Sequence, residues 1–100
     1  MTQAEREKIY QQFVDVCGVD SQKKMAIEEM SELTKELCKS WRCEGAEAIE
    51  ANTRNIQEEI ADTLNMTEQL KRIYGAEEIE RIRDEKLQKY AGKLLEKASS

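Results

Sequence analysis

The 100-residue chain contains no proline, no histidine and only four glycines. A strand-rich or α/β domain of this size needs many more turn residues, so their scarcity favours an all-α architecture. Hydrophobic residues make up 39% of the chain and charged residues 37%, a balance typical of amphipathic helices. The length predicts a single domain over residues 1–100.

The missing histidine also limits the chemistry that the chain can perform. It removes the commonest general base and the Ser–His and Cys–His pairs of nucleophilic catalysis. Three cysteines without CxxC spacing, Cys17, Cys38 and Cys43, do not form a zinc motif. Cys17 and Cys38 fall at apolar helical positions, so we expect structural, buried thiols. Any catalysis must therefore use carboxylates, a metal ion and lysine.

Charge and hydropathy exclude several classes of partner. A net charge of −5 and a pI near 4.9 leave no broad basic surface, so neither nucleic acid nor an anionic membrane is an expected partner. No run of eighteen apolar residues occurs, and residues 1–6 do not resemble a signal peptide. We therefore expect a cytoplasmic protein. With one Phe, one Trp and three Tyr, its core is small enough to favour burial against a second copy.

Glycines and capping residues predict four helices. A capping box at residues 2–5 begins the first helix, and Gly18 ends it after Cys17. A cap at residue 20 or 21 begins the second, which runs from about residue 22 to residue 41 or 42. Residues 43–53 should connect it to the third helix, with a helical turn at 46–51 and with Asn52 or Thr53 as the next cap. That helix ends before Gly75, and the fourth begins near residue 76.

Helical periodicity also predicts which side of each helix packs. The expected packing residues are Ala26, Ile27, Met30, Leu33, Leu37 and Trp41 in the second helix, Ile56, Ile60, Leu64, Thr67, Leu70 and Tyr74 in the third, and Ile79, Ile82, Leu87, Tyr90 and Leu94 in the fourth.

Two acidic pairs, Glu29/Glu32 and Glu59/Asp62, are the most informative pattern in the chain. The i, i+3 spacing puts both carboxylates of a pair on one side of a helix. Glu59 also lies on the apolar arc formed by Ile56, Thr63, Met66 and Leu70. A carboxylate that faces a core is costly unless it is neutralised, paired or bound to a cation. The four acids could therefore supply the oxygen ligands that Mg²⁺ prefers, although solvated acids in a Glu-rich chain remain the simple alternative.

These pairs sit in segments that resemble a known family. Ala26-Ile-Glu-Glu-Met-Ser-Glu-Leu33, followed after a gap by Glu58-Glu-Ile-Ala-Asp-Thr-Leu64, resembles the ExxE…ExxD signature of the MazG-like nucleoside triphosphate pyrophosphohydrolases. The likeness spans roughly residues 20–95 and extends to a last helix that carries lysines. It implies an all-α, four-helix MazG-like bundle completed by oligomerisation, as a homodimer or a homotetramer.

The resemblance also implies an activity and a site. Glu29, Glu32, Glu59 and Asp62 correspond to ligands of Mg²⁺, or alternatively of Mn²⁺, and Glu28 corresponds to an acid that holds or deprotonates the attacking water. The reaction would be hydrolysis of a nucleoside triphosphate to the monophosphate and pyrophosphate. Phosphoryl transfer depends mostly on positioning and charge neutralisation, so a chain without histidine can perform it.

Candidates for substrate contacts are cationic and polar residues near these pairs. Lys24 precedes Glu28 by one turn, Lys86 matches the lysine of the family's last helix, and Lys89 continues that face. The composition of these helices favours the alternative that each is a solvated surface lysine. Asn65 is a candidate contact to a base or sugar. Trp41 could stack on a base, but its position on the apolar stripe favours packing.

Two other functions fit the same sequence. The chain could be a non-catalytic helical interaction module whose acids only face solvent. It could also be an enzyme of the same type that acts on phosphoribosyl-ATP. The sequence pattern does not distinguish these from an enzyme acting on common nucleoside triphosphates.

Overall fold

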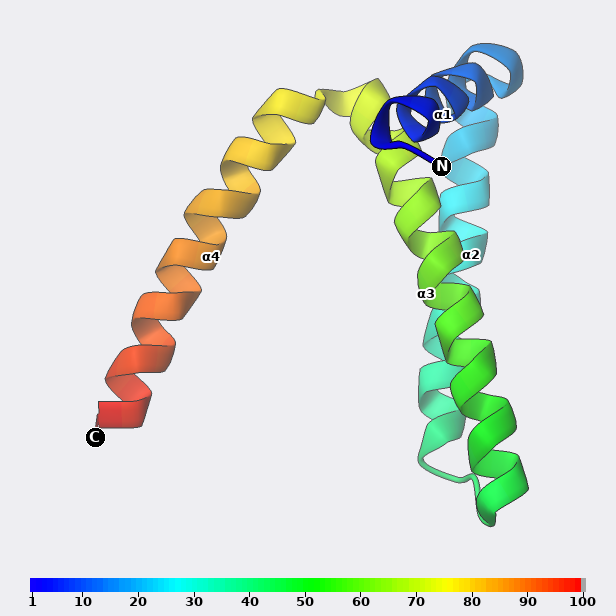
Figure 1. The fold of residues 1–100 in the computed structure, drawn as a ribbon, viewed down its shortest axis with the longest axis vertical. Coiled ribbons are helices and arrows are strands. Elements are labelled where there is room, and N and C mark those ends of the chain that lie inside the picture. The colour runs from blue at the N-terminus through cyan, green and yellow to red at the C-terminus, as the bar shows by residue number, and fades with distance from the viewer. Residues whose placement is uncertain (100) are drawn as a thin grey trace.

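The computed structural model describes residues 1–99 as four helices and no strand, which confirms the all-α prediction. The helices are α1 (Gln3–Cys17), α2 (Val19–Ser40), α3 (Ala46–Tyr74) and α4 (Ala76–Ser99). In Figure 1, α2 and α3 lie side by side as an antiparallel pair, and α1 crosses one end of that pair. Helix α4 leaves the same end as a separate arm and contacts only α3 among the described helices.

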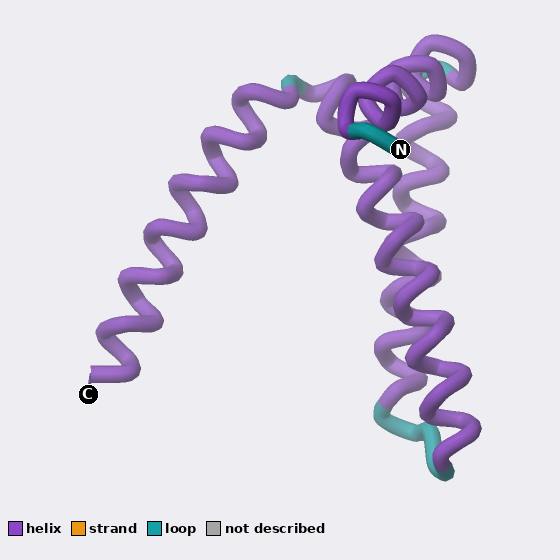
Figure 2. The backbone as a smooth tube through the Cα atoms, viewed as in Figure 1, coloured by secondary structure: helices purple, strands orange, loops and turns teal. Residues whose placement is uncertain are grey.

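The connections between the helices are short, as the loop colouring of Figure 2 shows. Gly18 alone separates α1 from α2 and Gly75 alone separates α3 from α4, with φ angles of 83° and 102°. Residues with a side chain rarely adopt such positive φ values, which explains why glycines occupy these turns. At the start of α1, the hydroxyl oxygen of Thr2 accepts a hydrogen bond from the backbone N–H of Glu5. These four observations agree with the predicted caps and stops.

The second and third helices begin earlier than predicted. Helix α2 begins at Val19, so Asp20 and Ser21 lie in its first turn and do not cap it. Helix α3 begins at Ala46 after Gly45, so the expected long connection is only residues 41–45. The segment Ala46-Glu-Ala-Ile-Glu-Ala51 consists mostly of strong helix formers, which explains why it joins α3. Asn52 is therefore a buried residue within the helix and not its cap.

The seam between α2 and α3 repeats with the four-and-three spacing of a coiled coil. These positions are buried or half-buried: Gln22, Ala26, Glu29, Leu33 and Glu36 on α2, and Asn52, Ile56, Glu59, Thr63 and Met66 on α3. Six of these ten positions are polar, which is unusual because such seams are normally apolar. The arc predicted around Glu59 is thus correct, and it faces α2.

The predicted core is only partly buried. Ala26, Leu33 and Ile56 lie in the seam as predicted. Most of the other predicted packing residues of α2 and α3 are exposed, because the seam is centred on a different side of each helix. Ile27 is 65% exposed, Leu64 is 62% exposed and Trp41 is 87% exposed.

The predicted packing side of α4 is also uncovered beyond Ile79, since no described residue of α4 is buried. Cys17 and Cys38 are exposed as well, so their predicted burial is wrong for this chain.

Candidate metal centre

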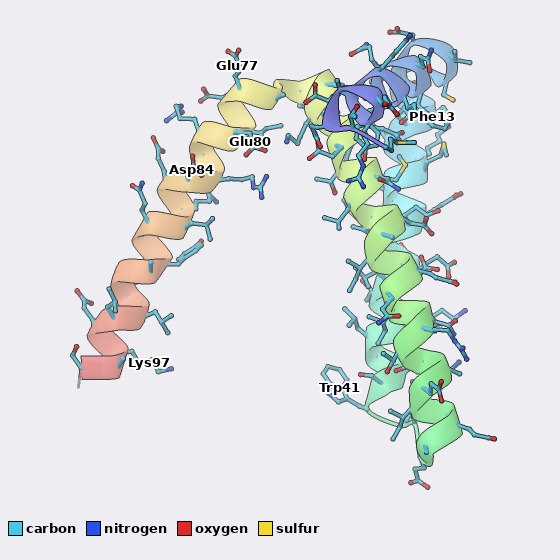
Figure 3. The ribbon with its side chains drawn as sticks, viewed as in Figure 1. Phe13, Trp41, Glu77, Glu80, Asp84 and Lys97 are labelled. Atoms are coloured by element: carbon cyan, nitrogen blue, oxygen red, sulfur yellow. The ribbon has the colours of Figure 1, made fainter. Side chains whose placement is uncertain are left out.

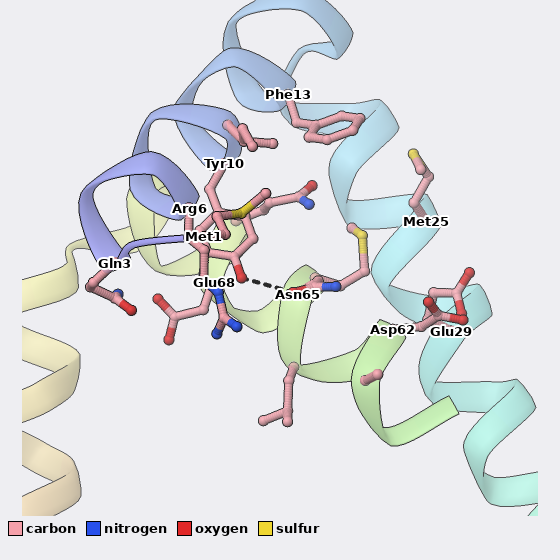
Figure 4. Close-up of a pocket in the computed structure, with 15 residues that line it drawn as sticks. Met1, Gln3, Arg6, Tyr10, Phe13, Met25, Glu29, Asp62, Asn65 and Glu68 are labelled. Carbon is pink, nitrogen blue, oxygen red and sulfur yellow. Dashed lines mark hydrogen bonds between the residues drawn. The ribbon is translucent and has the colours of Figure 1, made fainter. Parts of the chain in front are cut away.

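Three of the four predicted metal ligands converge at the middle of the α2–α3 seam. Glu29 from α2 and Glu59 and Asp62 from α3 each present a carboxylate oxygen, and these oxygens lie within 4.8 Å of one another. Figure 4 shows Glu29 beside Asp62. Glu32 is exposed and does not belong to this group, although its negative charge contributes to raising the pKa of Glu59.

A polar contact two helical turns away favours the observed alignment of α2 and α3. The amide nitrogen of Asn52 donates hydrogen bonds to the backbone carbonyl oxygen and to Oε2 of Glu36, both at 3.1 Å. Glu36 lies seven residues after Glu29, and Asn52 lies seven residues before Glu59. A buried polar contact in a helical seam favours one register over its alternatives. In this register, Glu29 lies opposite Glu59.

The electrostatics of the cluster oppose three negative charges. Burial raises the pKa of Glu29 most strongly, and the charges of Asp62 and Glu59 raise it further. Burial likewise raises the pKa of Glu59, and the charges of Asp62 and Glu32 raise it further. The Oε2 atom of Glu59 is buried and has no hydrogen-bond partner within residues 1–99. A cation at this position would compensate both the repulsion and the unpartnered oxygen.

The donor set fits a hard divalent cation. All three converging groups are carboxylates, with no nitrogen or sulfur donor among them. Mg²⁺ binds proteins through a few carboxylates and keeps several water molecules, and Mn²⁺ accepts the same oxygen ligands. Glu29, Glu59 and Asp62 are therefore suited to hold either ion.

A groove opens next to the acids, between α1 and the α2–α3 pair. Its volume is about 780 Å³, within the usual range for ligand pockets, and Glu29 and Asp62 belong to its lining. Asn65, one turn beyond Asp62, also lines it and accepts a hydrogen bond from the Tyr10 hydroxyl at 2.7 Å. The structure thus places Asn65 in the same groove as two of the acids.

Most residues of the groove were not predicted as site residues, among them three polar ones: Arg6 and Tyr10 of α1, and Gln69 of α3. The Arg6 guanidinium makes no ion pair or hydrogen bond within residues 1–99, so it is a cation available to an anionic ligand. Nothing in the sequence pattern indicates that α1 docks beside the acids. The sequence alone therefore predicts no role for Tyr10.

Other predicted site residues lie outside this cluster. Glu28 and Lys24 are exposed on α2, and Glu28 is not among the converging carboxylates. Lys86 and Lys89 are exposed on α4, which contacts neither α1 nor α2, so the chain does not bring these lysines to its own acids. Trp41 lies at the loop end of the α2–α3 pair, where it packs against no core (Figure 3).

Comparisons of the chain with protein-family models, curated proteins and solved structures found no match. Within residues 1–99, no helix combines the length and the apolar character needed to span a lipid bilayer.

Proposed function

We propose that the chain is a Mg²⁺-dependent, MazG-like nucleotide pyrophosphohydrolase that converts a nucleoside triphosphate and water into the monophosphate and pyrophosphate. One observation carries this proposal: a buried, unpartnered oxygen of Glu59 lies among three carboxylates that converge from two helices. Ordinary solvated acids do not bury an oxygen in this way, because an unpaired buried charge is costly.

The converging acids have the first role in the proposed reaction. Glu29, Glu59 and Asp62 hold Mg²⁺, or Mn²⁺ in its place, and Glu32 joins them from its exposed position on α2. A divalent ion bound there neutralises phosphate charge and makes a coordinated water more acidic. Glu28, next to Glu29, orients or deprotonates the attacking water, as the family resemblance implies. A nucleophilic side chain is not needed.

Cations near the groove have the second role, which is to bind the phosphates. Arg6 is the best placed of them, because it lines the same groove as Glu29 and Asp62 and has no acidic partner. Lys24 is the nearest predicted lysine along α2. Lys86 and Lys89 can contribute only through a second copy of the chain, since α4 does not contact α2.

The surface of the chain supports self-association into a homodimer or homotetramer. Its accessible area is 7897 Å², whereas a compact monomer of 11.6 kDa exposes about 5,800 Å². Its radius of gyration is 17.2 Å, against about 13 Å for a compact chain of this length. The excess of roughly 2,000 Å² is comparable to the area that stable interfaces bury. Exposed apolar side chains such as Ile27, Leu64 and Leu94 would provide the contacts.

The decisive assay is release of pyrophosphate from the eight common ribo- and deoxyribonucleoside triphosphates and from phosphoribosyl-ATP, with Mg²⁺ and with excess EDTA. We expect metal-dependent release of pyrophosphate and the monophosphate. A diphosphate product, or full activity in EDTA, would contradict the mechanism. Preference for phosphoribosyl-ATP would keep the mechanism and change the substrate.

Thermal unfolding separates the enzyme from a non-catalytic interaction module. Mg²⁺ that binds only the native acid cluster must raise Tm by mass action. An interaction module with solvated acids would show only the weak effect of ionic screening. Glu47→Gln, in the first turn of α3, is a suitable control because Glu47 is exposed and outside the cluster. Its Mg²⁺-induced rise in Tm should equal that of the unaltered chain.

A further inference from the structure

Some polar groups of the groove have no role in holding the metal ion or in binding the phosphates. Along α3, Asn65 lies about one turn beyond Asp62, and Gln69 lies one further turn along. Both residues line the groove that also includes Asp62 and Glu29 (Figure 4). A nucleotide whose phosphates lie at the acids would therefore extend its sugar and base past Asn65 toward Gln69.

The Asn65 side chain is oriented so that its amide N–H groups remain available to a ligand. The Tyr10 hydroxyl donates to Oδ1 of Asn65 at 2.7 Å, so the oxygen of this amide is already engaged. The amide nitrogen makes no hydrogen bond within residues 1–99, and the residue is exposed. Because an amide has one oxygen and one NH₂ group, fixing the oxygen also fixes the direction of the two N–H donors.

Tyr10 is itself held in place from two sides. Its side chain is buried, with the residue only 8% exposed. The Arg72 guanidinium lies over its ring at 5.3 Å from the centroid, a cation–π contact. The hydroxyl therefore acts as a fixed reference for the Asn65 amide.

Gln69 provides an independent indication of a ligand. The residue is only 5% exposed, and its Oε1 atom has no hydrogen-bond partner within residues 1–99. Buried side-chain oxygens normally find a partner. The groove is thus lined by Asn65, with its amide donors available, and by Gln69, whose unpaired oxygen is buried beside it.

We infer that this groove binds the nucleoside part of the substrate, with Asn65 donating to an acceptor on the base edge and Gln69 accepting from a neighbouring donor. Tyr10 is a positioning residue that selects the base by fixing the orientation of Asn65. This inference rests on the proposed function, since it assumes that the phosphates lie at the acids.

The inference predicts discrimination between bases of equal size. Cytosine carries an amino group where uracil carries a carbonyl, and adenine carries an amino group where guanine carries a carbonyl. A fixed Asn65 donor distinguishes the members of each pair, whereas a freely rotating amide presents either its donor or its acceptor. In Tyr10→Phe the amide is released, so discrimination should fall by about three- to tenfold, the usual value of one hydrogen bond.

The test is calorimetric titration with the α,β-methylene analogues of CTP, UTP, ATP and GTP, and with inorganic tripolyphosphate, in the presence of Mg²⁺. The unaltered chain should bind one member of a pair more tightly than the other, and tripolyphosphate more weakly than the preferred nucleotide. Tyr10→Phe should reduce the ratio of the two Kd values within the pair. Tyr74→Phe, the same change at an exposed site, should not alter it.

Several outcomes would overturn the inference. These are equal binding of all four analogues, tripolyphosphate binding as tight as the best nucleotide, no binding at all, or an unchanged ratio in Tyr10→Phe. Asn65→Ala provides a second variant, which should lower the same ratio without the loss of the Tyr10 ring. Because these measurements report affinity, they are independent of turnover. Hydrolysis that requires Glu59 but shows no base discrimination would refute only the inference, and an absence of Mg²⁺-dependent hydrolysis would refute the proposed function.

Discussion

Carboxyl groups in the α2–α3 pair and in the α4 arm have pKa values shifted in opposite directions. At the seam, burial and neighbouring acids raise the pKa of Glu29 and Glu59. On the arm, hydrogen bonds from Arg81 lower the pKa of Glu78, and those from Lys71 and Arg83 lower the pKa of Glu80. All four residues are glutamates in long helices. Their burial and their partners differ.

The difference agrees with the proposal that the seam acids hold a metal ion. The arm satisfies its acids locally with Arg81 and Arg83, through ion pairs one helical turn apart. The seam gathers acids and provides no basic residue to the group. Crowded, partly buried acids without a counter-ion destabilise a fold, so their presence is an indication of function.

Of the variants considered, Glu59→Gln should have the largest effect, because it removes one of the charges that distinguish the seam from the arm. It removes an anionic ligand while keeping the shape, so we expect turnover to fall by more than about 100-fold, beyond the usual effect of altering a ligand's supporting residues. In EDTA the variant should be as stable as the unaltered chain or more stable, because a repelled charge is lost. Parallel assays in Mg²⁺ and urea denaturation in EDTA measure both effects.

The neighbouring Glu58→Gln serves as the control, because Glu58 is exposed and lies outside the cluster. It should retain activity. Marked destabilisation of Glu59→Gln without metal would instead identify Glu59 as part of a structural ion pair.

Introducing charge on the apolar side of α4 should break the assembly. Leu87 and Leu94 are 62% and 67% exposed, and we expect them to be covered by a second copy. The double variant Leu87→Glu/Leu94→Glu should reduce the mass by half or more in light scattering, from at least twice 11.6 kDa. The variant Gln88→Glu introduces the same kind of charge without removing an apolar side chain, and it should leave the mass unchanged. A strictly monomeric unaltered chain at micromolar concentration would refute the assembly.

The pH dependence of stability should have opposite signs in the two regions. A raised carboxyl pKa favours the protonated folded form, so the contribution of Glu29 and Glu59 is present at low pH and is lost as pH rises through their raised values. The lowered pKa of Glu78 and Glu80 gives a contribution that is present at neutral pH and is lost as pH falls through their folded values.

Urea midpoints from about pH 2 to about pH 8 in EDTA test these signs, because the contribution of the lowered groups is lost only below their ordinary pKa. Glu59→Gln should weaken the decline toward high pH, and Glu80→Gln should weaken the decline toward low pH. Unchanged pH profiles in both variants would show that these shifts do not contribute to folding.

The smallest effect should come from the junction between the regions. Lys71 of α3 contacts Glu68 at 3.1 Å and Glu80 of α4 at 2.5 Å, and its side chain is only 12% exposed. Because Glu80 is 44% exposed, solvent screens much of this attraction. Glu80→Gln should lower Tm by a few degrees at low salt and by less in high salt. Glu85→Gln, on the outer part of the arm, should lower it less.

The sequence predicted the helices better than their contacts. Gly18 and Gly75 determine two turns through backbone conformation alone, which is a local property and therefore readable. The start of α3 was misplaced because Asn52 is a common capping residue, and only its tertiary contact with Glu36 shows its actual role.

The site was predicted only in part, because local helical spacing is readable from the sequence and tertiary contacts are not. Glu29, Glu59 and Asp62 follow from helical spacing and from the apolar arc around Glu59. The groove does not, because the docking of α1 through Tyr10 and Asn65 joins residues 55 positions apart.

The packing stripe of α2 was only partly right. Ala26 and Leu33 do lie in the seam, but Ile27, Leu37 and Trp41 are exposed. The prediction followed the apolar residues, whereas the seam is mostly polar.

The Asn52–Glu36 contact has a consequence for how the chain tolerates change. A slip of one turn between α2 and α3 would move the facing carboxylates apart by about 5.4 Å. The contact that opposes this slip lies within the helices and does not involve the loop at residues 41–45. Residues could therefore be inserted into that loop without shifting Glu29 relative to Glu59. The residues that align α2 with α3 are thus different from those that connect them, so we expect the loop to tolerate changes in length while the site keeps its geometry.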